Sequence, residues 1–312
     1  MQAIVNKLLP VVPMILIGLM PVFATEPAGP TSPSTWVSYL TGPESVHCPI
    51  VFIHGISAGF EKWEETAQFI SSGNVYKMRY SDKDHITHNY VGPPPPVWVW
   101  NVSYYSPDIV YESLAGDLTL YAHRLDKLLA TISKITGQDQ FVLVAHSMGG
   151  LVTRKMVTLN PENSRKVIAI LTVGTPHEGV PVSIPVVGQL RDLMTRSDFL
   201  KTLDRDWRGT AAQCPIRWGV IGGIATSNIH PKVGKNTTDF GGPGFVAIHS
   251  SIPFGEWQDA IKTIDTPTFN TAHFGFRAAI TGSHNELLNS SITRQGIFWA
   301  VSAGSSLNRH QN

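Results

Sequence analysis

The residues best suited to chemistry surround a serine in a short turn between an apolar run and a helical pattern. Residues 141–150 read Phe-Val-Leu-Val-Ala-His-Ser-Met-Gly-Gly, and Ser147 stands at the turn. A serine hydroxyl is a weak nucleophile at neutral pH and needs a base beside it. A sharp strand-to-helix turn projects the hydroxyl above the sheet, places the positive helix end beneath the developing charge and aims the next backbone N–H at the oxyanion. The stretch therefore predicts a serine nucleophile.

The turn around Ser147 is tight enough to need small residues two places before and two places after the serine. Ala145 and Gly149 occupy these places. The usual Gly-x-Ser-x-Gly motif has glycine at the first place, so Ala145 departs from it by one methyl group. The alternative is a plain strand, turn and helix with an incidental serine, and the full context of the stretch argues against it.

At these residues the chain resembles the secreted lipases and esterases of the α/β-hydrolase superfamily, among which Ala-His-Ser-Met-Gly-Gly is a form found in small bacterial lipases. The resemblance runs from about Val46 to Leu288. Four further stretches support it in order, namely His54-Gly55-Ile56, residues 173–177, residues 192–203 and the histidine loop at residues 282–288. The resemblance implies an α/β-hydrolase fold with a mostly parallel sheet of about six core strands, helices on both faces and cap elements built from loops and helices.

The negative oxygen of an acyl-transfer intermediate needs two donors aimed at the place where it forms. The family's oxyanion turn matches His54-Gly55-Ile56. We expect the two donors to be the backbone N–H groups of Ile56 and Met148, so the side chain at position 56 matters less than the shape of the turn.

The base must come late in the chain, because the order in this fold is serine, acid, histidine. Of twelve histidines, His284 follows the last expected strand, where the family places its base. We expect His249 and His273 to serve packing or to lie at the surface. The side chain of His146 should point away along the turn, and His177 should form hydrogen bonds in its Thr-Pro-His turn.

The acid should lie between the strand at residues 216–222 and His284. The family often has Asp-Gly-x-Val here, but Pro243 stands where the aspartate is expected. Asp239 lies four residues earlier in the same loop, so we predict Asp239 as the acid. Glu256, Asp259 and Asp265 remain as alternatives.

Strands alternating with helices predict a parallel sheet covered on both faces. We expect strands at residues 46–53, 75–80, 141–145, 167–173, 216–222 and 276–280, and helices at 61–70, 112–136, 148–159, 190–203 and 296–303. Residues 81–107 read as a long loop with a proline run followed by Trp98 and Trp100, which could either wall a substrate cleft or pack the loop to the core. Segments 81–107 and 181–208 could be cap or lid insertions.

The composition fits one α/β domain over residues 25–312. The chain has 312 residues, and 42% of them are apolar. Its net charge is only +1, so the charge gives no indication that the protein binds nucleic acid or an anionic membrane. Residues 1–24 resemble a signal peptide, with Lys7 before an apolar run and cleavage expected after Ala24. We therefore expect a protein that is secreted or periplasmic.

The two cysteines, Cys48 and Cys214, each precede an expected parallel strand. If these strands lie three places apart, the gap is about 14 Å at ~4.8 Å per place, which exceeds the roughly 7 Å limit for a disulfide. We expect free thiols.

These observations predict a carboxylic-ester hydrolase that uses Ser147, His284 and Asp239, needs no cofactor or metal, and acts on a small-molecule or lipid ester with transient contact to a lipid interface. No protein partner is predicted. The rival enzymes are an acyltransferase or a thioesterase with the same triad. The alternative that is not an enzyme is a binding module that kept the fold, and such a module would be recognised by a missing serine or histidine. A metal at Asp82, Asp84, His85 and His88 is a weaker interpretation than a solvated loop.

Overall fold

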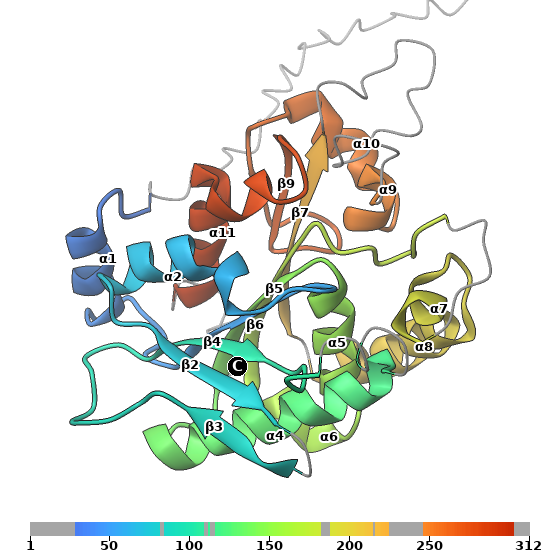
Figure 1. Cartoon of the computed structure of the whole chain (residues 1–312). Helices are drawn as coiled ribbons and strands as arrows, with labels where there is room; N and C mark the ends of the chain where they lie inside the picture. Colours follow the sequence, from blue (N-terminus) through green and yellow to red (C-terminus); the bar gives the residue numbers. More distant parts are fainter. Residues whose placement is uncertain are drawn as a thin grey trace, which may run out of the picture.

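The protein is built around one mixed, mostly parallel β-sheet (Figure 1). The computed structural model describes residues 29–81, 84–108, 112, 116–181, 188–214, 216–224 and 246–302. Within these residues, nine strands run in the order β3-β2-β4-β1-β5-β6-β7-β9-β8, and only the edge strands β3 and β8 pair antiparallel. Their bounds are β1 Ile50–Ile53, β2 Tyr76–Tyr80, β3 Ile86–His88, β4 Val99–Ser103, β5 Phe141–His146, β6 Val167–Val173, β7 Arg217–Ile224, β8 Thr268–Phe269 and β9 Phe276–Thr281. The expected α/β-hydrolase architecture is confirmed.

Helices cover both faces of the sheet. Side chains of α1, α2 and α11 pack into one hydrophobic core, and those of α4, α5 and α8 pack into the other. The helices are α1 Pro33–Leu40, α2 Glu64–Ser71, α4 Leu118–Thr136, α5 Met148–Val157, α6 Pro161–Arg165, α7 Gln189–Leu193, α8 Asp198–Gln213, α9 Ile248–Ser251, α10 Trp257–Ala260 and α11 Ser291–Val301, with 3₁₀ turns η1 Phe60–Lys62, η4 Ile261–Thr263 and η5 Glu286–Asn289. Strands buried on both faces explain the unbroken apolar runs in the sequence.

The parallel strands bring their carboxyl ends to one edge of the sheet. β1 leads into His54, β5 into Ser147 and β9 into the loop that holds His284. Open parallel sheets bind ligands at this edge. The topology therefore gathers three segments that are far apart in the sequence.

The helix expected at residues 112–136 begins later than predicted. The side chain of Asp117 caps α4 by accepting a hydrogen bond from the N–H of Leu120, and Gly137 ends the helix at φ 71°. Glu112 instead forms a buried ion pair with Arg124, at 2.7 Å. The spacing of the apolar residues predicted α4 itself correctly, but it does not reveal the capping residue at which the helix begins.

The prediction of one long loop at residues 81–107 was wrong, because this segment contains the strands β3 and β4. β4 lies between β2 and β1, and all five of its residues are buried. Trp100 is fully buried, and Trp98 stacks on it with ring centroids 5.9 Å apart. Asn101 and Ser103 interrupt the apolar pattern, which hid a central strand. The tryptophans here pack against the core.

The single helix expected at residues 190–203 is two helices, α7 and α8. Arg196, at φ 63°, turns the chain between them, and the Ser197 side chain caps α8 by accepting from the N–H of Leu200. Helix α1 lies in a segment for which the sequence predicted no helix, and the closing helix begins five residues earlier than expected, at Ser291. Serine caps start α1, α8 and α11 alike.

The prediction of free thiols is confirmed. Cys48 precedes β1 and Cys214 precedes β7, and these strands are three places apart in the sheet. Both cysteines are free, and burial raises the pKa of the Cys48 thiol to about 12. Cys48 therefore stays a neutral thiol at physiological pH.

Candidate active site

Ser147 lies on a sharp elbow between β5 and α5. Its backbone has φ 53° and ψ −131°, a region that residues with a side chain rarely adopt. The turn is held by a hydrogen bond from the N–H of Ser147 to the carbonyl of Val173 on β6, at 2.9 Å. Strain of this kind persists where the surroundings over-determine it, and it is common at catalytic positions.

The glycines after Ser147 allow the helix to approach its neighbours closely. A Cβ added to Gly149 would lie 2.3 Å from the carbonyl oxygen of His54, and one added to Gly150 would lie 2.1 Å from Oγ1 of Thr175. Ala145 is fully buried in the sheet beside Ile53. The alanine that departs from the usual motif is therefore accommodated, whereas Gly149 and Gly150 leave no room for a larger residue.

The turn after β1 lies directly against the nucleophile. A Cβ added to Gly55 would lie 2.7 Å from Cβ of Ser147. Met148 is the first residue of α5, where backbone N–H groups have no partner within the helix. Among the described residues, the N–H groups of Ile56 and Met148 donate to no acceptor. Both N–H groups thus have unused hydrogen-bonding capacity, and the Gly55 turn and the start of α5 lie next to Ser147.

A rigid polar framework holds this turn in place. Nδ1 of His54 donates to the carbonyl of Gly55 at 2.8 Å, and its Nε2 accepts from the Ser103 hydroxyl at 3.2 Å. The Tyr104 hydroxyl donates to the carbonyl of His54 at 2.9 Å. Burial lowers the pKa of His54 to about 4, so its ring stays neutral. His54 is therefore a neutral residue whose hydrogen bonds hold the turn after β1.

His146 contacts the loop that carries His284, which differs from the expectation that it only points away along the turn. Its Nε2 lies 3.2 Å from the carbonyl oxygen of His284, and the two rings are 4.4 Å apart. A carbonyl can only accept, so Nε2 carries the proton. Burial, followed by the nearby His284, lowers the pKa of His146 well below its usual value. His146 is therefore a neutral donor to this loop.

The histidine loop follows β9 and is held at several points. The carboxylate of Glu286 accepts from the N–H of Ser283 at 2.6 Å, and this bond lowers the pKa of Glu286. Nζ of Lys62 lies 3.4 Å from Oδ1 of Asn285, which joins the loop to η1. The loop thus brings His284 beside His146, the residue that precedes the serine.

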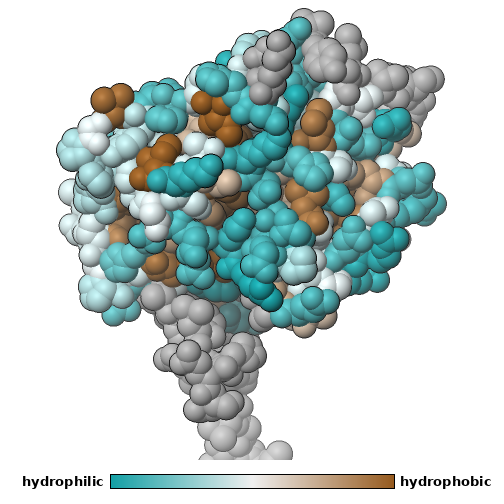
Figure 2. Space-filling model, turned by 90° about the horizontal axis from the view of Figure 1, so that it is seen from below, coloured by the Kyte–Doolittle hydropathy of each residue, from teal (hydrophilic) through white to brown (hydrophobic). Residues whose placement is uncertain are grey.

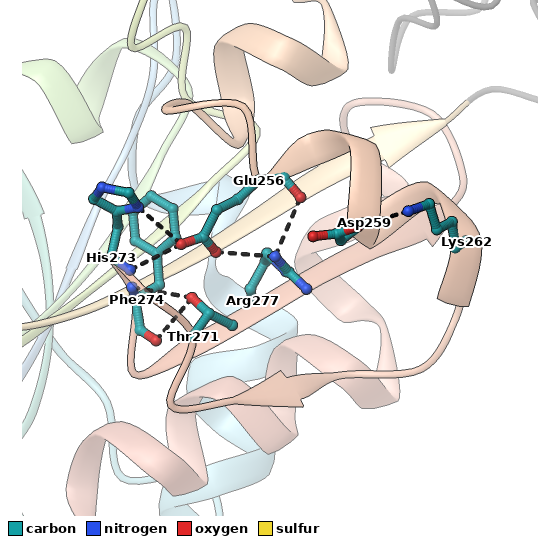
Figure 3. Close-up of polar contacts among 7 residues, drawn as sticks. All are labelled: Glu256, Asp259, Lys262, Thr271, His273, Phe274 and Arg277. Atoms are coloured by element: carbon teal, nitrogen blue, oxygen red, sulfur yellow. Dashed lines mark hydrogen bonds and ion pairs between the residues drawn. The ribbon is translucent and has the colours of Figure 1, made fainter.

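The predicted acid, Asp239, lies outside the described residues. It belongs to the segment that follows the carboxyl end of β7, the strand next to β9. Two of the alternatives, Glu256 and Asp259, are engaged elsewhere. Figure 3 shows Glu256 between His273 and Arg277, and Asp259 paired with Lys262 at 2.8 Å. Oδ1 of Asp265 accepts from the N–H of Thr281 at 2.7 Å.

A buried cation on the nucleophile helix was missed by the sequence analysis. The guanidinium of Arg154 lies 5.1 Å from the rings of both Trp207 and Trp218, and it donates to Asp204 at 2.9 Å. It also approaches Nδ1 of His177 at 3.3 Å. No motif marks this arginine, and only the packing of α5 against α8 reveals its role.

His177 forms structural hydrogen bonds, as predicted. Its backbone N–H donates to the carbonyl of Thr175 at 2.9 Å, and its Nε2 bonds the Thr172 hydroxyl at 3.0 Å. Burial, followed by the charge of Arg154, lowers its pKa well below the usual value. The described residues contain no group of three or more side chains that could hold a metal ion.

Comparisons with known proteins agree with this architecture. The family described as PGAP1-like alpha/beta domain matches residues 45–208. The crystal structure of the lin2722 gene product from Listeria innocua superposes with a TM-score of 0.52 at 13% identity, covering 80% of this chain and 93% of the other. Lipase BlEst2 from Bacillus licheniformis in its mature form superposes with a TM-score of 0.51 at 12% identity, covering 84% of this chain and 94% of the other.

The family match includes β1, the Gly55 turn that follows it, β5 and the serine elbow. No helix among the described residues is long and apolar enough to span a membrane. The family, the fold and the elbow together support a hydrolase. This chain belongs to the PGAP1-like alpha/beta domain family, within the α/β-hydrolase superfamily.

Proposed function

We propose that this protein is a serine hydrolase of carboxylic esters, with lipid-like esters as its substrates. The observation that carries the proposal is the elbow at Ser147, where a non-glycine residue at φ 53° sits against the Gly55 turn and at the start of α5. A buried serine used only for packing needs neither the strained backbone nor two adjacent free N–H groups.

The proposed reaction has two acyl-transfer steps. His284 takes the proton of Ser147 while Oγ attacks the ester carbonyl, and the oxyanion receives hydrogen bonds from the N–H groups of Ile56 and Met148. The alcohol leaves with the proton from His284. Water then attacks the acyl-enzyme with His284 again acting as base, which releases the acid and restores Ser147.

Asp239 is the proposed partner that orients His284. Its place after β7 matches the order serine, acid, histidine along the chain. The contacts of Glu256 with Arg277 and of Asp259 with Lys262 support this choice, because they engage both alternatives away from the histidine loop. Asp265 is the remaining alternative, since it contacts the end of β9.

The signal peptide ending at Ala24 and export from the cytoplasm are part of the same proposal, since the apolar run after Lys7 supports them. Transient contact with a lipid interface agrees with a lipid-like substrate. Figure 2 shows that the face seen from below is largely hydrophilic, with separate hydrophobic patches rather than one continuous apolar surface. Contact with lipid would therefore use another face or be limited in area.

Covalent labelling tests the proposal. A fluorophosphonate should modify the folded protein once, at Ser147, and the Ser147→Ala variant should take up no label. Hydrolysis of p-nitrophenyl esters of increasing chain length should be lost in the same variant, and release of acid should dominate over acyl transfer to an added alcohol. Absence of labelling in folded protein would disprove the enzyme assignment, and dominant acyl transfer would instead make the protein an acyltransferase.

A further inference from the structure

A pocket lies apart from Ser147, between α8, the amino end of β7, the connection from α9 to α10 and the turn between β8 and β9. Its volume is about 580 Å³, and its largest lining side chains are Trp207, Trp218 and Phe254. Small-molecule sites have volumes of this order and are mostly apolar with a few polar groups. We propose that this pocket binds a hydrocarbon-chain carboxylate, with the chain against the aromatic rings and the carboxylate on Arg208.

The pocket is separate from the elbow. Trp218 is the second residue of β7, at its amino end. The N–H of Ser147 bonds the carbonyl of Val173, which lies opposite Ile221, three residues further along β7. Three residues of strand span about 10 Å, and β7 lies two places from β5 in the sheet. Binding here therefore does not depend on the proposed reaction.

The aromatic wall of the pocket is fixed by contacts within the protein. The rings of Trp207 and Trp218 are 5.1 Å apart at 68°, and Arg154 lies 5.1 Å from each of them. The indole N–H of Trp218 also donates to the Thr172 hydroxyl at 3.3 Å. Because these side chains are already ordered, little conformational entropy is lost when a ligand binds, which favours binding.

Phe254 is the unusual feature of this wall. Its backbone lies at φ 64°, and 48% of the residue is exposed. A phenylalanine in the left-handed region is a conformational outlier. Its ring packs on those of His273 and Phe274, but the fold holds the other part of this apolar ring in solvent at a cost in backbone strain. The ring lies 4.8 Å from the imidazole of His273. This arrangement fits a ring that contacts a ligand.

The polar rim indicates the charge of the ligand. Figure 3 shows the His273 side chain turned toward Glu256, whose Oε1 lies 3.0 Å from Nδ1. Because the carboxylate accepts, Nδ1 carries the proton and the Nε2 edge is left for another partner. Arg208 is exposed and forms no ion pair with any described residue. A guanidinium pairs well with a carboxylate, so the rim fits an acid rather than an amine.

Calorimetric titration of the full chain tests the proposal with two probes of the same chain length, dodecanoate and dodecyltrimethylammonium, each below its aggregation concentration. Dodecanoate should bind at least tenfold more tightly. Arg208→Gln should remove this preference, because a hydrogen bond to a charged group is worth roughly ten- to a hundredfold in affinity. Arg205→Gln is the matched control, since Arg205 lies on the same helix but pairs with Asp206 at 3.0 Å.

Two further variants test the apolar wall. Phe254→Ala should weaken both probes, whereas Leu120→Ala, which shortens another exposed apolar side chain, should weaken neither. Protein labelled at Ser147 with a dodecylphosphonofluoridate should still bind one equivalent of dodecanoate. The proposal is overturned if Arg208→Gln or Phe254→Ala binds like the wild type, or if the label abolishes binding. Failure to label would count against the esterase proposal alone, because the Arg208 comparison needs no label.

Discussion

The imidazole rings of His146 and His284 lie 4.4 Å apart, and Nε2 of His146 bonds the backbone carbonyl of His284 at 3.2 Å. This contact ties the residue before the nucleophile to the proposed base, across 138 positions of sequence. The buried ring of His146 is neutral, so it contributes a donor without placing a second charge beside the base.

Replacing His146 should show whether its N–H donor or its ring matters for activity. His146→Phe keeps a ring but loses the N–H, so we expect kcat to fall by at least tenfold, because the base is less well positioned. His146→Gln keeps an N–H donor and should retain more activity than the phenylalanine variant. Steady-state kinetics across pH should show the loss mainly in kcat. Equal activity in both variants would show that the hydrogen bond does not position His284.

Replacing Asp239 should test the proposed acid. Asp239→Asn should lower kcat by roughly a thousandfold or more, because the imidazole loses the partner that orients it. Asp265→Asn is the control, since Asp265 caps the end of β9 through the N–H of Thr281. Circular dichroism and kcat should be measured for both variants. Near-normal turnover of Asp239→Asn would exclude Asp239, and a large loss in Asp265→Asn alone would transfer the role to Asp265.

Replacing Gly149 should damage the elbow through overpacking. A Cβ at this position would lie 2.3 Å from the carbonyl oxygen of His54, which is backbone and cannot turn aside. We expect Gly149→Ala to lower the free energy of unfolding by about 1–3 kcal/mol. Gly209→Ala on α8 is the matched control: its added Cβ meets nothing within 4 Å, and alanine should stabilise the helix by about 0.5–1 kcal/mol. Urea unfolding of both variants measures the difference, and equal stability would contradict the close approach.

His54 should make the folded state less stable in mild acid. Its pKa is about 4 in the folded protein, against an ordinary value of 6.5, because burial disfavours the charged ring. The unfolded chain therefore binds the proton first, so stability is full above pH 6.5 and falls as the pH drops from 6.5 toward 4. The loss from this one group reaches about 3 kcal/mol.

His54→Gln is the variant that isolates this contribution. Its unfolding free energy, measured by urea titration at several pH values, should change less between about pH 7 and pH 4 than that of the wild type. His47→Gln is the comparison, since His47 lies outside the buried core. An unchanged pH slope in His54→Gln would show that His54 is not the group that titrates.

The sequence by itself determined the serine elbow and the strands whose apolar runs are continuous. β5 and β6 were predicted to within one residue, because a strand buried on both faces leaves an unbroken apolar signature. The resemblance further indicated the Gly55 turn and the loop of His284. The free thiols also followed from the sequence, because the distance between parallel strands is fixed by hydrogen-bond geometry.

Only the tertiary structure decided the other features. β4 was hidden because Asn101 and Ser103 break its apolar pattern, and its central place in the sheet depends on pairing with β1 and β2. The donor from His146 to His284 and the clamp of Trp207 and Trp218 on Arg154 join distant segments. Local sequence encodes the propensity of a strand or helix, whereas these contacts arise only when packing brings separate elements together.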